Sequence, residues 1–61
     1  MTFEIYAGND GWWYWRLKAG NGRIVADGAE GYSSKGSCKR AVTTFKREYP
    51  WFIIKAEVRY V

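Results

Sequence analysis

The 61-residue sequence has no histidine and only one cysteine, Cys38. A single cysteine excludes a disulfide within the chain. It also argues against a structural zinc site, which takes four ligands drawn mainly from cysteine and histidine. Without histidine, the chain lacks the side chain that most often acts as a general base near neutral pH. We therefore expect no metal, no cofactor and no catalytic activity.

Long hydrophobic runs are also missing. The longest uncharged apolar run, Trp51 to Ile54, is far shorter than the roughly 20 residues that cross a bilayer. The opening Met1-Thr2-Phe3-Glu4 has neither the basic start nor the apolar stretch of a secretory signal. These features, together with the lone thiol, favour a cytoplasmic protein that does not bind membranes.

The short length limits how the chain can be stabilised. A domain of this size buries only about 60% of the surface that its unfolded chain exposes. Below about 70–80 residues, proteins commonly add disulfides, a metal or a second subunit. Because the first two are disfavoured, the remaining supports are the high aromatic content, 20% of residues, and self-association. We predict one domain, residues 1–61, that forms a homodimer.

What the sequence does have is an aromatic run from Trp12 to Lys18, in which apolar side chains alternate with aromatic or cationic ones. Successive side chains of a strand point to opposite faces of the sheet. One face of this strand is therefore predicted to enter the core through Trp13, Trp15 and Leu17. The other face carries large aromatic and cationic side chains: Trp12, Tyr14, Arg16 and Lys18.

Two further strands are predicted on either side of this run. Residues 3–6 alternate apolar and polar, as in a half-buried strand, and the turn-forming residues 8–11 connect them to the aromatic strand. Asn21-Gly22 is a strong hairpin signal before a third strand at residues 23–27. Three strands with short turns predict an antiparallel meander.

A helix and a final strand follow. Ser33 or Ser34 can cap the helix, and apolar residues then recur at helical spacing: Cys38, Ala41, Val42 and Phe45. The helix must end before Pro50. Beyond it the period returns to two, with one apolar face formed by Phe52, Ile54, Ala56, Val58 and Tyr60. The pattern β-β-β-α-β predicts an α+β fold, an antiparallel sheet with one helix packed on a face.

Several stretches together resemble the YegP-like family, small bacterial and archaeal proteins grouped as a domain of unknown function (1508). The similarity covers about the first two-thirds of the chain and is carried by Phe3-Glu4-Ile5-Tyr6, Trp13-x-Trp15-Arg16-Leu17-Lys18-Ala19, Asn21-Gly22-Arg23-Ile24-Val25-Ala26, Glu30-Gly31-Tyr32-Ser33-Ser34-Lys35 and Cys38. The resemblance implies a unit that occurs in tandem or as a homodimer sharing one sheet and exchanging C-terminal strands. It implies no catalytic residues and no activity. The sequence departs from the family at Trp12 and Tyr14, which replace polar residues, and from Glu48 onward.

The C-terminal segment points to the same dimer on physical grounds. Fully buried, each large apolar side chain of its last strand would contribute about 1.5–3 kcal/mol, and one helix can hardly cover them together with Trp13, Trp15 and Phe45. We therefore predict an interface formed by Phe52, Ile54, Val58 and Tyr60. The alternative is that the last strand inserts into the sheet of its own subunit.

The candidate functional surface is the outer face of the sheet: Tyr6, Trp12, Tyr14, Arg16 and Lys18. Aromatic rings beside cations can bind single-stranded nucleic acid by base stacking and phosphate contacts. The same residue types are enriched at protein-binding hot spots. The net charge of +4 is uneven: residues 1–31 hold three basic and four acidic residues, and residues 32–61 hold seven and two. Because most positive charge falls on the predicted helix, we favour a non-catalytic binding or assembly module over nucleic-acid binding.

An enzyme is the least favoured class. Ser33 and Ser34 adjoin Lys35, but helix capping accounts for them, and a serine nucleophile needs a positioned base. Cys38 lies on the apolar stripe of the helix, where a thiol behaves as a small hydrophobic side chain.

Overall fold

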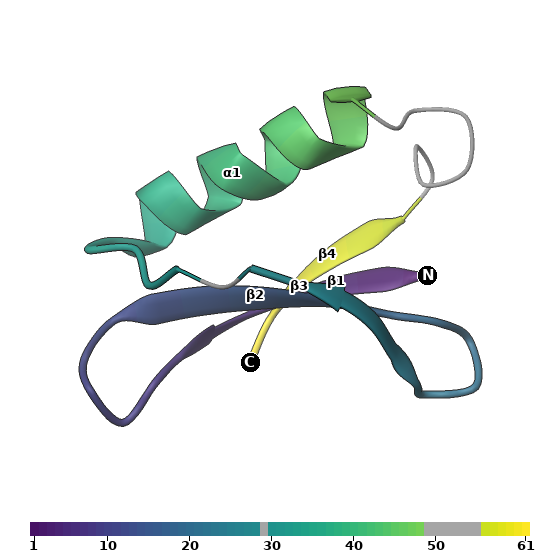
Figure 1. Ribbon diagram of the computed structural model, residues 1–61, viewed down its shortest axis with the longest axis horizontal. Coiled ribbons are helices and arrows are strands. Elements are labelled where there is room, and N and C mark those ends of the chain that lie inside the picture. Colours follow the sequence, from purple (N-terminus) through teal and green to yellow (C-terminus); the bar gives the residue numbers. More distant parts are fainter. Residues whose placement is uncertain (29, 49–55) are drawn as a thin grey trace.

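The computed structural model describes residues 1–28, 30–48 and 56–61. Their elements, in chain order, are β1 (Thr2–Ala7), β2 (Trp13–Lys18), β3 (Ile24–Asp27), α1 (Lys35–Glu48) and β4 (Glu57–Tyr60). This order confirms the predicted β-β-β-α-β pattern and the α+β class. Figure 1 shows two layers, with α1 lying across one face of the sheet and no described element covering the other face.

The two predicted hairpins form at the expected turns. Gly22 has a φ of 86°, a conformation that costs a side-chain-bearing residue free energy and that glycine adopts readily. Its N–H donates to the carbonyl of Ala19 at 2.9 Å, and the Asn21 side chain accepts from the N–H of Arg23 at 3.0 Å. The Asn-Gly step therefore closes the turn between β2 and β3.

Helix α1 begins as the sequence predicts. The Ser34 hydroxyl accepts a hydrogen bond from the Ser37 N–H at 3.1 Å, so Ser34 is the capping residue and Ser33 is not. The helix ends at Glu48, ahead of Pro50. Within it, Cys38 and Val42 are fully buried, which confirms the apolar stripe.

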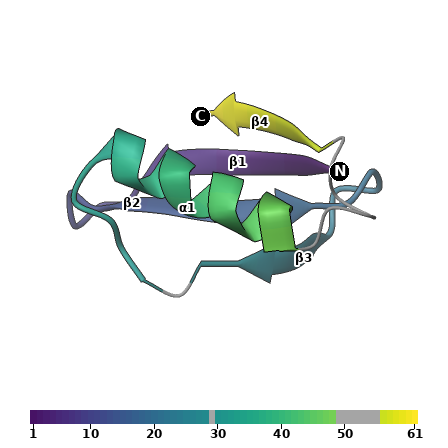
Figure 2. The same cartoon turned by 90° about the horizontal axis from the view of Figure 1, so that it is seen from above.

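The sheet order is β3-β2-β1-β4, and its last pairing corrects the prediction. Strand β1 runs antiparallel to β2, with Phe3 opposite Leu17, but parallel to β4, with Phe3 opposite Val58. The sheet is therefore mixed rather than antiparallel. Parallel neighbours require a long crossover, and the chain makes one: after β3 it passes through α1, over the face of the sheet, and reaches the far side of β1 (Figure 2).

The core lies between α1 and the sheet. Among the described residues, the buried apolar side chains are Phe3, Ile5, Trp15, Leu17, Cys38, Val42 and Ala56. The ring of Trp15 packs against Phe3 and Phe45, with centroids 5.6 and 5.2 Å apart. These tilted and edge-on ring contacts are the arrangements that aromatic pairs favour. Trp13 and Phe45, half-buried, pack at the margin of this cluster.

The C-terminal strand is present but stays within its own sheet in this structure. Val58 packs against the core, whereas Tyr60 is 46% exposed. One copy buries Trp15 and half-buries Trp13 and Phe45; the sequence predicts that one helix can hardly cover these together with the apolar side chains of the last strand. The other two predicted interface residues, Phe52 and Ile54, lie outside the described residues.

Candidate functional site

The uncovered face of the sheet brings together four of the five predicted surface residues. Strand β1 contributes Tyr6, and β2 contributes Tyr14, Arg16 and Lys18. The register places Tyr6 directly opposite Tyr14. The fifth residue, Trp12, is part of the hairpin and not of the strand, because it precedes the first residue of β2. Its side chain is 47% exposed.

One end of this face is a cluster of charged side chains around Glu4. The guanidinium Nε of Arg16 donates to Glu4 Oε1 at 2.6 Å, and Lys18 Nζ lies 3.8 Å from Glu4 Oε2. The hydrogen bond from Arg16 and the nearby positive charges lower the pKa of Glu4 below its ordinary value. Both cations predicted to contact phosphate thus share a carboxylate, which partly neutralises them.

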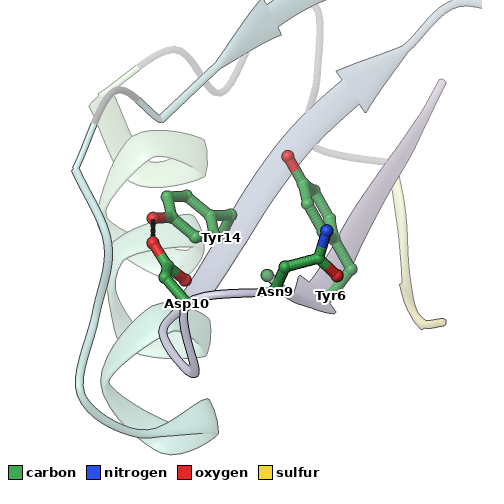
Figure 3. Close-up of a pocket in the computed structure, with 5 residues that line it drawn as sticks. Tyr6, Asn9, Asp10 and Tyr14 are labelled. Carbon is green, nitrogen blue, oxygen red and sulfur yellow. Dashed lines mark hydrogen bonds between the residues drawn. The ribbon is translucent and has the colours of Figure 1, made fainter.

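The other end of the face is aromatic. The rings of Tyr6 and Tyr14 stack with centroids 5.9 Å apart, and the guanidinium of Arg16 lies 4.6 Å from the centre of the Tyr6 ring. The Tyr14 hydroxyl donates to the carboxylate of Asp10 in the β1–β2 hairpin (Figure 3). The Trp12 N–H donates to the same carboxylate at 3.0 Å.

Beside the two rings is a shallow surface cavity of about 340 Å³, open to solvent and lined by Tyr6, Gly8, Asn9, Asp10 and Tyr14. Figure 3 shows the two rings rising from the strands, with the Asn9 and Asp10 side chains at the foot of the cavity. Hydrogen bonds from Tyr14 and from the Trp12 N–H lower the pKa of Asp10, so its carboxylate is ionised at neutral pH. The hydrogen bond between Tyr14 and Asp10 also raises the pKa of the Tyr14 hydroxyl.

Sequence reasoning assigned the 8–11 segment to a turn and missed this cavity. The available signal was the spacing of Asp10 and Tyr14. A carboxylate in a turn just before a strand can reach the outer-face side chains of the first residues of that strand. Alternation already placed Tyr14 on that face, but only the hairpin geometry brings Asp10 beside it.

Charge is divided between the two layers as the sequence predicted. Lys39, Arg40 and Arg47 are exposed on α1, and α1 lies on the side of the sheet opposite to the uncovered face (Figure 1). Lys35 lies elsewhere: its ammonium is 5.3 Å from the centre of the Trp13 ring and 4.9 Å from that of Tyr60. That lysine joins the start of α1 to β2 and β4.

Residues with potential chemistry are few in the described part of the chain. Cys38 is fully buried, and this burial raises the pKa of its thiol, the opposite of what a reactive cysteine requires. In residues 1–28, 30–48 and 56–61, no group of three His, Cys, Asp or Glu side chains is placed to hold a metal ion. No described helix is long and apolar enough to cross a membrane.

A mixed four-stranded sheet with one covering helix and one bare aromatic face defines a small α+β domain, and comparison with known proteins identifies its family. The chain belongs to the family described as "Domain of unknown function (DUF1508)", whose model matches residues 8–50. A UPF0339 protein of Neisseria meningitidis serogroup B is 52% identical over 46 residues, 75% of this chain and 80% of that protein. A UPF0339 protein of Treponema denticola is 40% identical over 48 residues, 79% of this chain and 81% of the relative.

Two further similarities extend this picture. A protein of Stutzerimonas stutzeri, named for its position in the 5′ region of the ptx operon, is 41% identical over 49 residues, but these make up only 43% of its length. The solution structure of a protein from Haloferax volcanii superposes with a TM-score of 0.73 at 37% identity, over 84% of this chain and 90% of that one. The α+β fold is therefore shared with a solved relative, and the function of the family is unknown.

Proposed function

We propose that this protein is a non-catalytic binding or assembly module that acts as a homodimer with a shared sheet. The observation that carries the proposal is the exposure of apolar side chains along both edges of the sheet. On β3, Ile24 and Val25 are 55% and 51% exposed; after Val58, Tyr60 and Val61 are 46% and 65% exposed. Apolar edge strands with unpaired backbone groups favour pairing with another chain.

Exchange of the C-terminal strand is the form of dimer that we propose. Strand β4 lies at the sheet margin beyond α1 (Figure 2). It is held by its ladder to β1, by the hydrogen bond from Lys46 Nζ to the Ala56 carbonyl at 3.0 Å, and by Lys35 against Tyr60. A partner's β4 would satisfy the same groups in the same place. Domain swapping is accessible because it exchanges identical contacts.

The length of one relative supports this arrangement. More than half of the Stutzerimonas stutzeri protein lies outside the match, enough for a second unit of this size in the same chain. Two units joined in tandem would provide within one chain the shared sheet that a single-unit protein obtains by dimerising.

Two measurements test the dimer and the exchange separately. Light scattering on a size-exclusion column should give twice the chain mass of 7.1 kDa; a mass of one chain at micromolar concentration contradicts the proposal. For exchange, Thr2→Cys and Glu57→Cys place two thiols at paired positions of β1 and β4. Oxidation should then give a covalent dimer on a non-reducing gel, whereas a covalently closed monomer would show that β4 stays in its own subunit. The single variant Thr2→Cys controls for random cross-linking.

Weak single-stranded nucleic-acid binding is the alternative function. Its support is the gathering of Tyr6, Tyr14, Arg16 and Lys18 on one uncovered face. The pairing of Arg16 and Lys18 with Glu4 weakens this alternative, since phosphate contacts need available cations. Tryptophan fluorescence titrations with a mixed oligonucleotide at two salt concentrations test it. Binding that collapses with added salt supports it, and an unchanged spectrum at low salt removes it.

A further inference from the structure

We propose that the cavity between Tyr6, Tyr14 and Asp10 binds an organic cation, an alkylammonium or guanidinium group. This deepens the proposed binding function by naming the chemistry of the ligand, and it does not depend on dimer formation. The cavity is at the lower end of the 300–1,000 Å³ range of ligand pockets. A single cationic head group or side-chain terminus fits within that volume.

The aromatic walls supply the first part of the argument. The face of an aromatic ring attracts a cation within about 6 Å of its centre, and two rings stand together here. The Tyr6 ring already receives one guanidinium, that of Arg16, 4.6 Å from its centre. Arg16 does not line the cavity, so the protein's own cation leaves the cavity open.

The charge in the cavity supplies the second part. Asp10 is ionised, and what lowers its pKa is hydrogen bonding from Tyr14 and Trp12; no positive charge in the described part of the chain contributes. Among the described residues, both ion pairs of the sheet face involve Glu4 and neither involves Asp10. A carboxylate without a counter-charge beside two rings, in a chain of net charge +4, favours a positive ligand over a neutral or negative one.

The third part is that the cavity is held open in advance. The Asp10 carboxylate is fixed by two hydrogen bonds, from the Tyr14 hydroxyl and the Trp12 N–H. A Cβ at Gly8 would lie 2.6 Å from the Tyr14 ring and 2.8 Å from Asp10 Oδ1. Binding to such a preorganised site avoids part of the ordering cost.

The experiment compares choline with its neutral isostere 3,3-dimethylbutan-1-ol in amide-detected NMR titrations of the full chain. We expect saturable shifts with choline at the Gly8–Trp12 hairpin and at Tyr14, and much weaker shifts with the alcohol. Asp10→Asn should weaken choline binding by up to about fivefold, the upper range for losing one exposed ion pair, and Gly8→Ala should weaken it by filling the cavity. Asp27→Asn, which removes an exposed carboxylate from β3, should leave the affinity unchanged.

Further arms identify the source of the cation and the results that refute the proposal. A short peptide carrying one trimethyllysine or one arginine should compete with choline if the natural ligand is a protein side chain; binding of choline without competition assigns the site to a free small molecule. Equal binding of the neutral isostere, equal weakening by Asp27→Asn, or no shift beyond that of matched sodium chloride overturns the inference. If light scattering still shows a dimer in that case, the proposed assembly function stands while the cation site falls.

Discussion

A methyl group added at Gly28 should destabilise the fold because it would collide with the Trp15 side chain. Gly28 follows β3, and its N–H donates to the Trp15 carbonyl at 3.0 Å. A Cβ there would overlap Trp15 Nε1 and would lie 2.9 Å from two further atoms of the indole. The indole is only 6% exposed and packs against Phe3 and Phe45, so it has little room to move. Overpacking of this kind costs about 1–3 kcal/mol.

Gly36→Ala is the matched control, because it adds the same methyl group in open space. Apart from its chain neighbours and the backbone of its own helix, no atom of the described residues lies within 4 Å of a Cβ at Gly36, which sits in the first turn of α1. Alanine is favoured over glycine in a helix by up to about 1 kcal/mol, so this variant should be as stable as the parent or more so. The two glycine-to-alanine substitutions therefore have opposite expected signs.

Thermal unfolding followed by circular dichroism, at one protein concentration because a dimer's stability depends on it, measures both variants. A loss of 1 kcal/mol lowers the Tm of a domain of this size by about 4–8 °C. Gly28→Ala should therefore melt roughly 10 °C below the parent, for a mid-range loss of about 2 kcal/mol. An unchanged Tm for Gly28→Ala, or an equal fall for Gly36→Ala, would refute the packing of Trp15 described above.

Three other predictions concern titrating or reactive groups. The thiol of Cys38 is fully buried with a raised pKa, so alkylation by iodoacetamide should be slow in the native protein and fast in urea; rapid native labelling would contradict this burial. The pKa of Tyr14 is raised above 10.0 chiefly by its hydrogen bond to Asp10, so this contact stabilises the fold below pH 10 and loses its effect as the pH rises through the raised pKa. In Asp10→Asn, the ultraviolet titration of Tyr14 should move to lower pH, and an unmoved titration would show that the hydrogen bond is absent. Glu4 has a pKa below 4.5, mainly because of Arg16, so its stabilising effect is present above pH 4.5 and fades as the pH falls through the lowered value. Arg16→Gln should raise the Glu4 pKa in a carboxyl-carbon NMR titration, and an unaltered value would mean that another group sets it.

Local structure was predictable because it depends on residues close together in sequence. Alternation identified the buried face of β2, where Trp15 and Leu17 are indeed buried. Helical spacing identified the apolar face of α1 as Cys38, Ala41, Val42 and Phe45; Cys38 and Val42 are buried, and Ala41 and Phe45 are half-buried. The Asn-Gly step located the turn at Gly22, which has the positive φ that such a turn needs. Each of these features follows from a side-chain period or a backbone preference within a few residues.

The direction of β4 was not predictable by the same means. Its alternating pattern indicates a strand, but an identical pattern suits a parallel or an antiparallel neighbour. The outcome was decided by where α1 delivers the chain, which depends on the helix packing over β1 and β2. The aromatic–acidic cavity is a second case, since the position of Asp10 depends on how the hairpin folds back toward Tyr14.

The sequence by itself determined the elements, their buried faces and the division of charge between the helix and the first half of the chain, because periodicity, turn chemistry and composition act locally. Only the tertiary structure decided that Glu4 forms ion pairs with both Arg16 and Lys18, while the ionised carboxylate of Asp10 lies beside two aromatic rings. These pairings join residues on neighbouring strands and in a hairpin, and strand register and loop path fix the distances between them. The same outer face therefore carries a partly neutralised cationic cluster at one end and an open, negatively charged aromatic cavity at the other.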